Sequence, residues 1–176
     1  MGKTILTCDP SITGWGWAVI SDQGTLLDCG CIKTTPTDKK LRIRKGDDTV
    51  RRVHEINTAL LAVITAYDVH YMLSELPHGS QSAVAAKMIG IVTGIAQTLA
   101  DACQLGIEWY SEGDAKMFML GKRSAVKQEM IDAVTKKMIV TWTGIKYKDE
   151  AVADSLAIYL VAMDQSPVLK MLKQLK

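Results

Sequence analysis

The chain has 176 residues, the size of one domain, and a chain of that length buries about two-thirds of its unfolded surface. Hydrophobic residues make up 48% and charged residues 23% of it, which excludes wholesale disorder and a coiled coil. Lys and Arg (21) nearly balance Asp and Glu (19), so the net charge of +2 indicates no particular partner. We expect a single domain over residues 1–166 and a short basic tail over residues 167–176.

Basic residues are concentrated in one stretch of the chain. Asp47 and Asp48 are the acidic residues among seven basic ones, which are Lys39, Lys40, Arg42, Arg44, Lys45, Arg51 and Arg52. Such a cluster can follow the phosphates of a nucleic acid. On charge alone, a solvated loop with the first turn of a helix explains it equally well.

Compartment and membrane signals are weak. The four cysteines (Cys8, Cys29, Cys31 and Cys103) form no C-x-x-C pair, which is typical of reduced thiols in the cytosol. The first residues lack the pattern of a signal peptide, so we expect a cytoplasmic protein. Residues 83–102 are as long as a bilayer span, but Lys87, Gln97 and Asp101 interrupt them, which favours a buried or interface helix.

Hydrophobic periodicity predicts an α/β domain whose first three strands are antiparallel. Turn residues separate these strands, and a loop rich in basic residues follows them. The predicted strands are residues 4–8, 15–21, 25–33, 71–76 and 106–110, and the predicted helices are residues 49–67, 80–104, 124–138 and 149–163, with a loop over residues 34–48. The expected fold is a five-stranded mixed sheet flanked by helices.

Two carboxylates follow predicted strands at their C-terminal ends. Asp9 comes directly after the first strand, and Glu75 lies near the end of the fourth, in an otherwise apolar run. A lone buried charge is strongly disfavoured, so a compensating cation is needed. If these two strands are neighbours, the carboxylates meet and a divalent metal ion can supply that charge.

The last predicted helix adds a second acidic pair. Glu150 and Asp154 are four residues apart and share one face, whereas Asp149 points away from Asp154 if the helix is regular. Charge–dipole compensation at a helix N-terminus explains Asp149 and Glu150 equally well. It explains Asp154 poorly, because this residue lies in the apolar stripe of the helix.

The acidic set without a suitable His or Cys favours Mg²⁺ or Mn²⁺ over zinc. Two such ions, roughly 4 Å apart, can activate water on one side of a phosphate and stabilise the leaving oxygen on the other. Phosphodiester hydrolysis is therefore the expected reaction, with Asp9, Glu75, Glu150 and Asp154 as the metal ligands.

Several motifs occur in the order found in one nuclease family. Residues 9–16 (DPSITGWG) resemble the opening motif of the RuvC family of Holliday-junction resolvases, and residues 30–34 (GCIKT), Glu75, residues 110–127 and residues 153–158 (ADSLAI) resemble its later motifs. The resemblance implies an RNase H-like fold, a homodimer, and Mg²⁺-dependent paired nicking of four-way DNA junctions. It also implies that Lys116 and Lys127 lie near the scissile phosphate, where positive charge stabilises the transition state. Either lysine is alternatively a solvated helix residue.

The chain departs from the family pattern in the last helix. The family's second acid, three residues before the position of Asp154, is replaced by Ala151. Glu150 is the best substitute, and Asp149 is the alternative if the helix starts late. The short opening motif and the long basic loop are typical of a divergent branch, such as a bacteriophage member acting in the host cytoplasm.

Rival functions keep the same fold. One is a nuclease acting on other branched DNA or on an RNA/DNA hybrid, because fold alone does not determine substrate. Another is a catalytically inactive DNA-binding protein, which Ala151 favours and the retained Asp9, Glu75, Asp154 and Lys127 argue against. The turn from Asp9 to Gly14 after the first strand is also similar to that of actin-like ATPases. We give this alternative little weight, because such an ATPase needs a second phosphate loop and a much longer chain.

Overall fold

The structure is a computed structural model that describes residues 2–174, with side chains described as far as residue 171. Five strands form one mixed sheet in the order β3-β2-β1-β4-β5. β1, β2 and β3 are antiparallel neighbours, whereas β4 is parallel to β1 and β5 is parallel to β4. The strands are β1 (Thr4–Asp9), β2 (Gly14–Ser21), β3 (Leu26–Lys33), β4 (Val69–Leu76) and β5 (Gly106–Ser111). The predicted five-stranded mixed sheet is confirmed.

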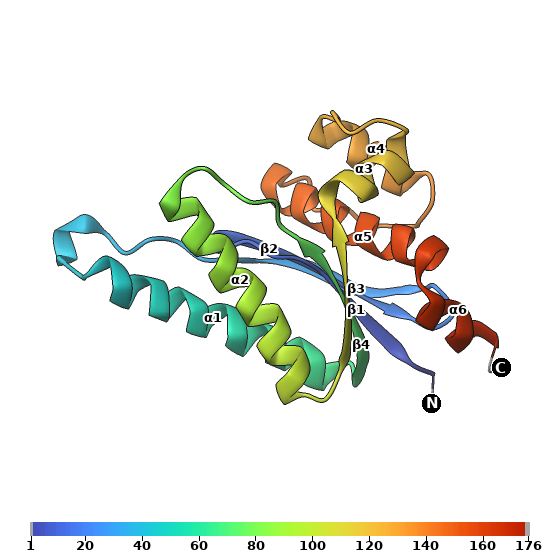
Figure 1. The fold of residues 1–176 in the computed structure, drawn as a ribbon, viewed down its shortest axis with the longest axis horizontal. Coiled ribbons are helices and arrows are strands. Elements are labelled where there is room, and N and C mark those ends of the chain that lie inside the picture. The colour runs from blue at the N-terminus through green and yellow to red at the C-terminus, as the bar shows by residue number, and fades with distance from the viewer. Residues whose placement is uncertain (1, 175–176) are drawn as a thin grey trace.

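Helices cover both faces of this sheet (Figure 1). α1 and α2 pack on one face, and α5 lies across the other face together with α3 and α4. The helices are the short 3₁₀ helix η1 (Lys39–Leu41), α1 (Lys45–Ala66), α2 (Ala83–Ala102), α3 (Glu112–Leu120), α4 (Lys127–Thr135), α5 (Lys146–Gln165) and α6 (Pro167–Gln174). The domain therefore has three layers with a hydrophobic core on each side of the sheet.

Alternation along the central strands assigns each side chain to one of these two cores. In β1, Ile5 packs on the α5 side, and Leu6 and Cys8 pack on the α1/α2 side. In β4, Leu73 packs on the α5 side, whereas Met72 packs on the opposite side. Successive side chains of a strand point to opposite faces, so this parity extends to the residues that end each strand.

α5 lies close against the sheet. The Thr7 hydroxyl of β1 donates a hydrogen bond of 2.5 Å to the Ser155 carbonyl of α5, although both residues are fully buried. Gly16 of β2 lies directly under the helix, where a Cβ would come 2.1 Å from the Ala151 carbonyl oxygen. Only glycine permits such an approach, so the position of α5 depends on this residue.

Several element boundaries differ from those predicted. α1 begins at Lys45 instead of residue 49, because Asp47 and Asp48 lie in its first turn and favour a helix N-terminus. α3 was not predicted at all, although Ser111 caps it by accepting a hydrogen bond of 3.0 Å from the Asp114 amide. An S-x-x-D sequence is a recognised start of a helix, and here it was missed.

The segment expected as a basic tail is helical over Pro167–Gln174, and Leu169 is buried in the core on the α5 side.

α2 is the one helix of residues 2–174 that is long and apolar enough to cross a membrane by length and composition. Val92 and Ile95 of α2 pack into the core on the α1/α2 side, while much of the helix remains open to solvent.

Candidate active site

A pocket of about 580 Å³ opens where β1 and β4 end. Five of the six residues predicted to act in catalysis line it, namely Asp9, Glu75, Glu150, Asp154 and Lys127. The rest of the lining consists of Glu112, Lys33, Tyr147, Ala151 and residues 11, 13 and 14 between Asp9 and the start of β2. Residues from both halves of the chain therefore meet at one end of the sheet.

Strand parity brings the first two carboxylates together. Asp9 lies four residues after Ile5, and Glu75 lies two residues after Leu73, so both side chains point to the face that α5 covers. β1 and β4 are adjacent and parallel, with Cys8 opposite Ser74. The two carboxylates therefore lie side by side at the same end of the sheet.

α5 presents the other two predicted acids to the same pocket. Glu150 and Asp154 are one helical turn apart, and their side chains are only 17% and 19% exposed. The Lys127 ammonium of α4 donates to Asp154 Oδ2 at 3.0 Å, and Lys146 lies 4.0 Å from Glu150. An ion pair thus already occupies part of the Asp154 carboxylate.

Asp149, the alternative to Glu150, has a different role. α5 starts at Lys146, three residues earlier than predicted, which turns Asp149 away from the pocket. Its carboxylate accepts hydrogen bonds from the Thr143 amide (2.9 Å), the Thr143 hydroxyl (2.8 Å) and the Gly144 amide (2.9 Å). Asp149 therefore fixes the loop before α5.

The sixth predicted residue, Lys116, lies outside the residues that line the pocket. It is on α3 and forms an ion pair with Glu112, the acid one turn earlier. Glu112 itself lines the pocket, and it was missed because α3 was not predicted. Lys116 still influences the site, since its charge lowers the pKa of Asp154.

The carboxylates strongly disfavour each other's ionisation. Burial, the charge of Asp154 and the charge of Glu112 raise the pKa of Asp9 to about 7, although Lys127 opposes this shift. Burial and the charges of Asp9, Asp154 and Glu112 raise the pKa of Glu75 to about 9. The pocket therefore holds more negative charge than its own lysines can neutralise.

Lys127 is the main positive charge near these acids. Burial alone would lower its pKa, but the charges of Asp154, Asp9 and Glu150 and the hydrogen bond to Asp154 raise it. Burial raises the pKa of Asp154, and Lys127 is the largest influence in the opposite direction. Lys127 therefore stays protonated beside the acidic residues.

A second lysine lies at the edge of the pocket. The Lys33 ammonium at the end of β3 is 4.2 Å from the centre of the Tyr147 ring, within the range of a cation–π contact. Both residues line the pocket. Lys33 belongs to the stretch that resembles a family motif, but it was not predicted as a site residue.

The donor set suits an oxygen-coordinated divalent ion. Five carboxylates and two lysines line the pocket, which leaves an excess of negative charge in a partly buried site. Hard cations such as Mg²⁺ prefer oxygen ligands of this kind. Over the described part of the chain, however, no three Asp, Glu, His or Cys side chains are already grouped as a metal site.

The mixed sheet and the acidic pocket at the ends of β1 and β4 define a protein of the RNase H-like class. A family model described as "Crossover junction endodeoxyribonuclease RuvC" matches residues 5–162. The chain therefore belongs to the RuvC family of junction-resolving nucleases, which are metal-dependent enzymes. The resemblance seen in the sequence motifs is confirmed.

Solved structures show the same fold. RuvC of Thermus thermophilus in complex with a Holliday junction substrate is 21% identical, with a TM-score of 0.69 over 90% of this chain and 92% of that one. Another T. thermophilus RuvC structure is 22% identical, with a TM-score of 0.66 and the same coverage. The yeast mitochondrial Holliday junction resolvase Ydc2 is 11% identical, with a TM-score of 0.65 over 97% and 82% of the two chains. No curated protein sequence matches.

Proposed function

We propose that this nuclease resolves four-way DNA junctions through paired, Mg²⁺-dependent cuts at the pocket formed by Asp9, Glu75, Glu150 and Asp154. The observation that carries this proposal is the meeting of carboxylates from β1, β4 and α5 in one pocket beside Lys127. Each cut is expected to leave a 3′-hydroxyl and a 5′-phosphate.

The pocket has the charge and the ligand atoms for two Mg²⁺ ions, which Mn²⁺ is expected to replace. When bound, the ions would activate water and stabilise the oxygen that leaves the phosphate. By analogy with the RuvC family, Asp9 would be a ligand of both ions. Glu75 lies beside it on β4, and Glu150 and Asp154 approach from α5.

Lys127 in the pocket and Lys116 beside it have a separate role in this proposal. Lys127 would hold a scissile phosphate oxygen, because its side chain is 58% exposed and its ammonium group already lies at the acidic site. Lys116 would act less directly, through its ion pair with Glu112 and its influence on Asp154. Lys127 therefore is the stronger candidate for contact with the substrate.

Paired cutting requires two active sites at a fixed separation, and a two-fold homodimer provides them. We propose that the α1/α2 face forms the dimer interface. Val50 of α1 is 68% exposed and Val84 of α2 is 72% exposed. A Cβ at either Gly90 or Gly94 of α2 would meet no atom within 4 Å, so a second backbone can approach closely.

The dimer is tested by sedimentation. A dimer at micromolar concentration supports the interface, and a Gly94→Glu variant is expected to sediment as a monomer and to lose paired cutting. A wild-type protein that remains a stable monomer and still makes paired cuts would contradict the proposal.

Junction resolution is tested with a labelled four-way junction, a nicked duplex and an RNA/DNA hybrid, each incubated with Mg²⁺ or with chelator. Symmetric paired nicks in the junction alone, and only with Mg²⁺, are expected. Equal cutting of all three substrates would reject junction selectivity, and undiminished cutting in chelator would reject the metal requirement.

A further inference from the structure

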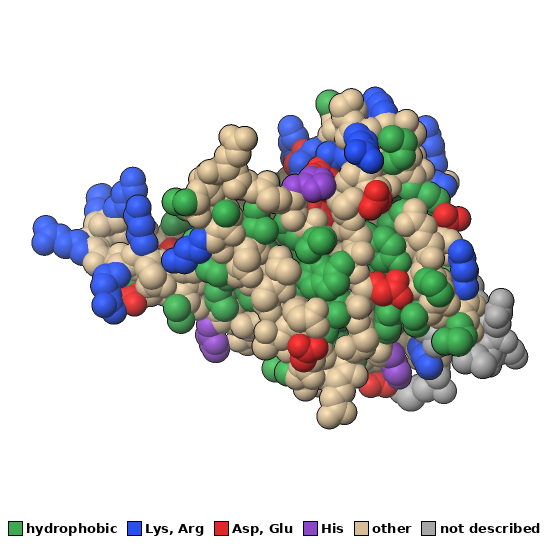
Figure 2. Space-filling view, in the orientation of Figure 1, with side chains coloured by type: hydrophobic (Ala, Val, Ile, Leu, Met, Phe, Trp, Pro, Cys, Tyr) green, Lys and Arg blue, Asp and Glu red, His purple; other side chains and the backbone are tan. Residues whose placement is uncertain are grey.

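The strongest charged feature outside the pocket is a projection at the start of α1, which we call the basic projection (residues 38–45). Its residues are all exposed, and Figure 2 shows Lys and Arg side chains gathered at this end of the molecule. Within residues 2–174, ion pairs of its basic side chains are confined to Arg44 with Asp47, at 2.7 Å. Among the described residues, its basic side chains without an ion pair are Lys39, Lys40, Arg42 and Lys45, and its single acid is Asp38.

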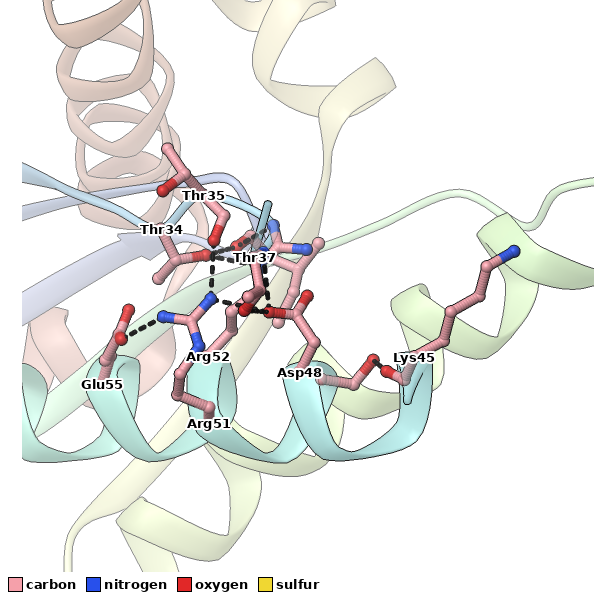
Figure 3. Close-up of polar contacts among 10 residues, drawn as sticks. Thr34, Thr35, Thr37, Lys45, Asp48, Arg51, Arg52 and Glu55 are labelled. Atoms are coloured by element: carbon pink, nitrogen blue, oxygen red, sulfur yellow. Dashed lines mark hydrogen bonds and ion pairs between the residues drawn. The ribbon is translucent and has the colours of Figure 1, made fainter. Parts of the chain in front are cut away.

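The projection has a well-defined base (Figure 3). The Thr37 amide and hydroxyl donate to Asp48 Oδ1 at 2.9 and 2.5 Å. The Arg51 guanidinium donates to the same oxygen at 2.7 Å and to the Thr35 carbonyl at 2.7 Å. The hydrogen bonds from Thr37 and Arg51 lower the pKa of Asp48 to about 2, so its carboxylate stays ionised at neutral pH.

A buried arginine connects this base to the active-site pocket. Arg52 is 8% exposed, and its guanidinium donates to the Thr34 hydroxyl at 2.7 Å and to the Ile12 carbonyl at 3.0 Å. The Thr34 hydroxyl also donates to the Ile12 carbonyl. Ile12 lies between Ser11 and Thr13, which both line the pocket. The basic projection is therefore held in a fixed relation to the site of cutting.

We propose that the basic projection is a second DNA site, which binds the phosphate backbone of the duplex arm flanking the cut. The proposal rests on the proposed function, because it takes the pocket to hold the scissile phosphate. Lys45 lies seven residues before Arg52, a distance of about 10 Å along a helix. At about 3.4 Å per base pair, the projection reaches phosphates roughly three or more base pairs from the cut.

Charge and order both favour duplex DNA as the occupant. Basic groups on a flexible loop would lose conformational entropy when they bind a polyanion. Here the contacts among Thr37, Asp48 and Arg51 already order the base of the projection in the folded protein, so less entropy is lost on binding. Phosphate contacts of this kind orient the protein on its substrate without reading sequence. The projection would therefore help to place a junction arm.

The first experiment measures binding in chelator, so that no cutting is needed. Lys40→Gln/Arg42→Gln is compared with Lys3→Gln/Lys170→Gln, which removes two exposed charges beyond the start of β1. Loss of two phosphate contacts should make the slope of log affinity against log salt shallower by about 1.8. The loss of affinity relative to the wild type should therefore be roughly 60-fold larger at 0.1 M salt than at 1 M salt. The Lys3/Lys170 variant should keep the wild-type slope on both a junction and a linear duplex.

A second experiment separates ordered placement from total charge. Asp48→Ala and Asp47→Ala each remove one negative charge and so raise the net charge by one, but only Asp48→Ala removes the acceptor for Thr37 and Arg51. Asp48→Ala should weaken DNA binding several-fold relative to the wild type, although the net charge is higher. Asp47→Ala should bind DNA as tightly as the wild type or more tightly.

Two results would overturn the proposal. One is an unchanged affinity and salt slope for Lys40→Gln/Arg42→Gln, as expected if the projection binds an acidic protein instead. The other is an equal loss in the Lys3/Lys170 variant. A failure of junction cutting in the presence of Mg²⁺ would contradict the proposed function and leave this binding comparison intact, so the two failures are distinguishable.

Discussion

Gly16 of β2 and Ala151 of α5 are in backbone contact, so close that a Cβ on Gly16 would lie 2.1 Å from the Ala151 carbonyl oxygen. Gly16 is also the residue paired with Asp9 across β1 and β2. The same contact thus connects the first acidic residue of the pocket to the helix that carries the last two. It also keeps Ala151 in the wall of the pocket.

Gly16→Ala should therefore destabilise the protein and misplace α5. Overpacking of this kind costs about 1–3 kcal/mol, and the obstructing atom here is backbone that cannot rotate away. Thermal unfolding should show a lower Tm, and junction cutting should fall as well. Gly46→Ala is the control, because Gly46 lies in the first turn of α1 and a Cβ added to it would meet no neighbouring atom within 4 Å. Equal Tm values for both variants would contradict the contact.

Asp9→Asn should bind junctions but fail to cut them. The amide keeps the size of the side chain and removes the charge needed for a shared metal ligand, while the DNA-binding surfaces are unchanged. A loss of about 3 kcal/mol of transition-state stabilisation corresponds to more than about 100-fold in rate. Gel-shift binding and single-turnover cutting of one labelled junction measure both properties. Normal cutting by this variant would reject the site assignment.

Glu150 and Asp149 are neighbours with different expected roles. Glu150→Gln should raise the Mg²⁺ concentration needed for half-maximal cutting roughly 10-fold and leave the Tm nearly unchanged. Asp149→Asn should lower the Tm and leave the Mg²⁺ requirement nearly unchanged. The Asp149 carboxylate accepts three hydrogen bonds from Thr143 and Gly144, and their disruption costs about 1–3 kcal/mol. A Mg²⁺ titration and a melting curve for each variant separate the two residues. A higher Mg²⁺ requirement in Asp149→Asn alone would reverse the assignment.

Stability in chelator should fall as the pH rises. The pKa of Glu75 is raised from 4.5 to about 9 and that of Asp9 from 3.8 to about 7 in the folded protein. The folded state therefore binds protons that the unfolded state has released, and this stabilisation is complete below about pH 4. It is lost as the pH rises through about 7 for Asp9 and about 9 for Glu75.

Glu75→Gln removes part of this dependence. In chelator its Tm should decrease less than that of the wild type between pH 5 and pH 9, and at pH 8 it should be the more stable protein, although inactive. Mg²⁺ should raise the Tm of the wild type more than that of Glu75→Gln. Parallel pH curves for the two proteins in chelator would show that burial and the neighbouring carboxylates do not raise the pKa of Glu75.

Lys127 should matter for the rate of cutting more than for substrate binding. Lys127→Gln removes the ammonium that lies 3.0 Å from Asp154, and we expect kcat to fall by about 100-fold with little change in KM. Lys127→Arg should recover part of the activity. Lys122→Gln is the matched control, since it breaks an exposed ion pair of 2.6 Å with Glu129. Equal effects of Lys127→Gln and Lys122→Gln would leave Lys127 no special role.

Much of the site was predictable because the apolar runs of the strands, and the residues at which these runs end, can be recognised in the sequence. Asp9 ends β1 and Glu75 lies one residue before the end of β4, and an acid in that place already indicates a crevice at the C-terminal ends of the strands. Asp154 was predictable because it interrupts an apolar helical stripe, and the ordered motifs supported all three. These signals are local, so they survive without knowledge of the fold.

Residues whose role depends on a helix boundary were harder to assign. Asp149 and Glu150 differ by a rotation of about 100°, and the actual start of α5 at Lys146 decides which of them faces the pocket. Glu112 was missed with the whole of α3, and Lys33 was passed over at the end of β3. Boundaries are set by capping and by tertiary contacts, which hydrophobic periodicity does not register.

The sequence by itself determined the fold class, the family, and the choice of Asp9, Glu75 and Asp154 as candidate site residues, because strand ends, periodicity and motif order are encoded within short segments. Only the tertiary structure decided which further groups share the pocket, the distance between Lys127 and Asp154, and the anchoring of the basic projection to Ile12 through Arg52. Each of these depends on segments far apart in the chain. Their contacts arise from the packing of α1 and α5 on opposite faces of the sheet.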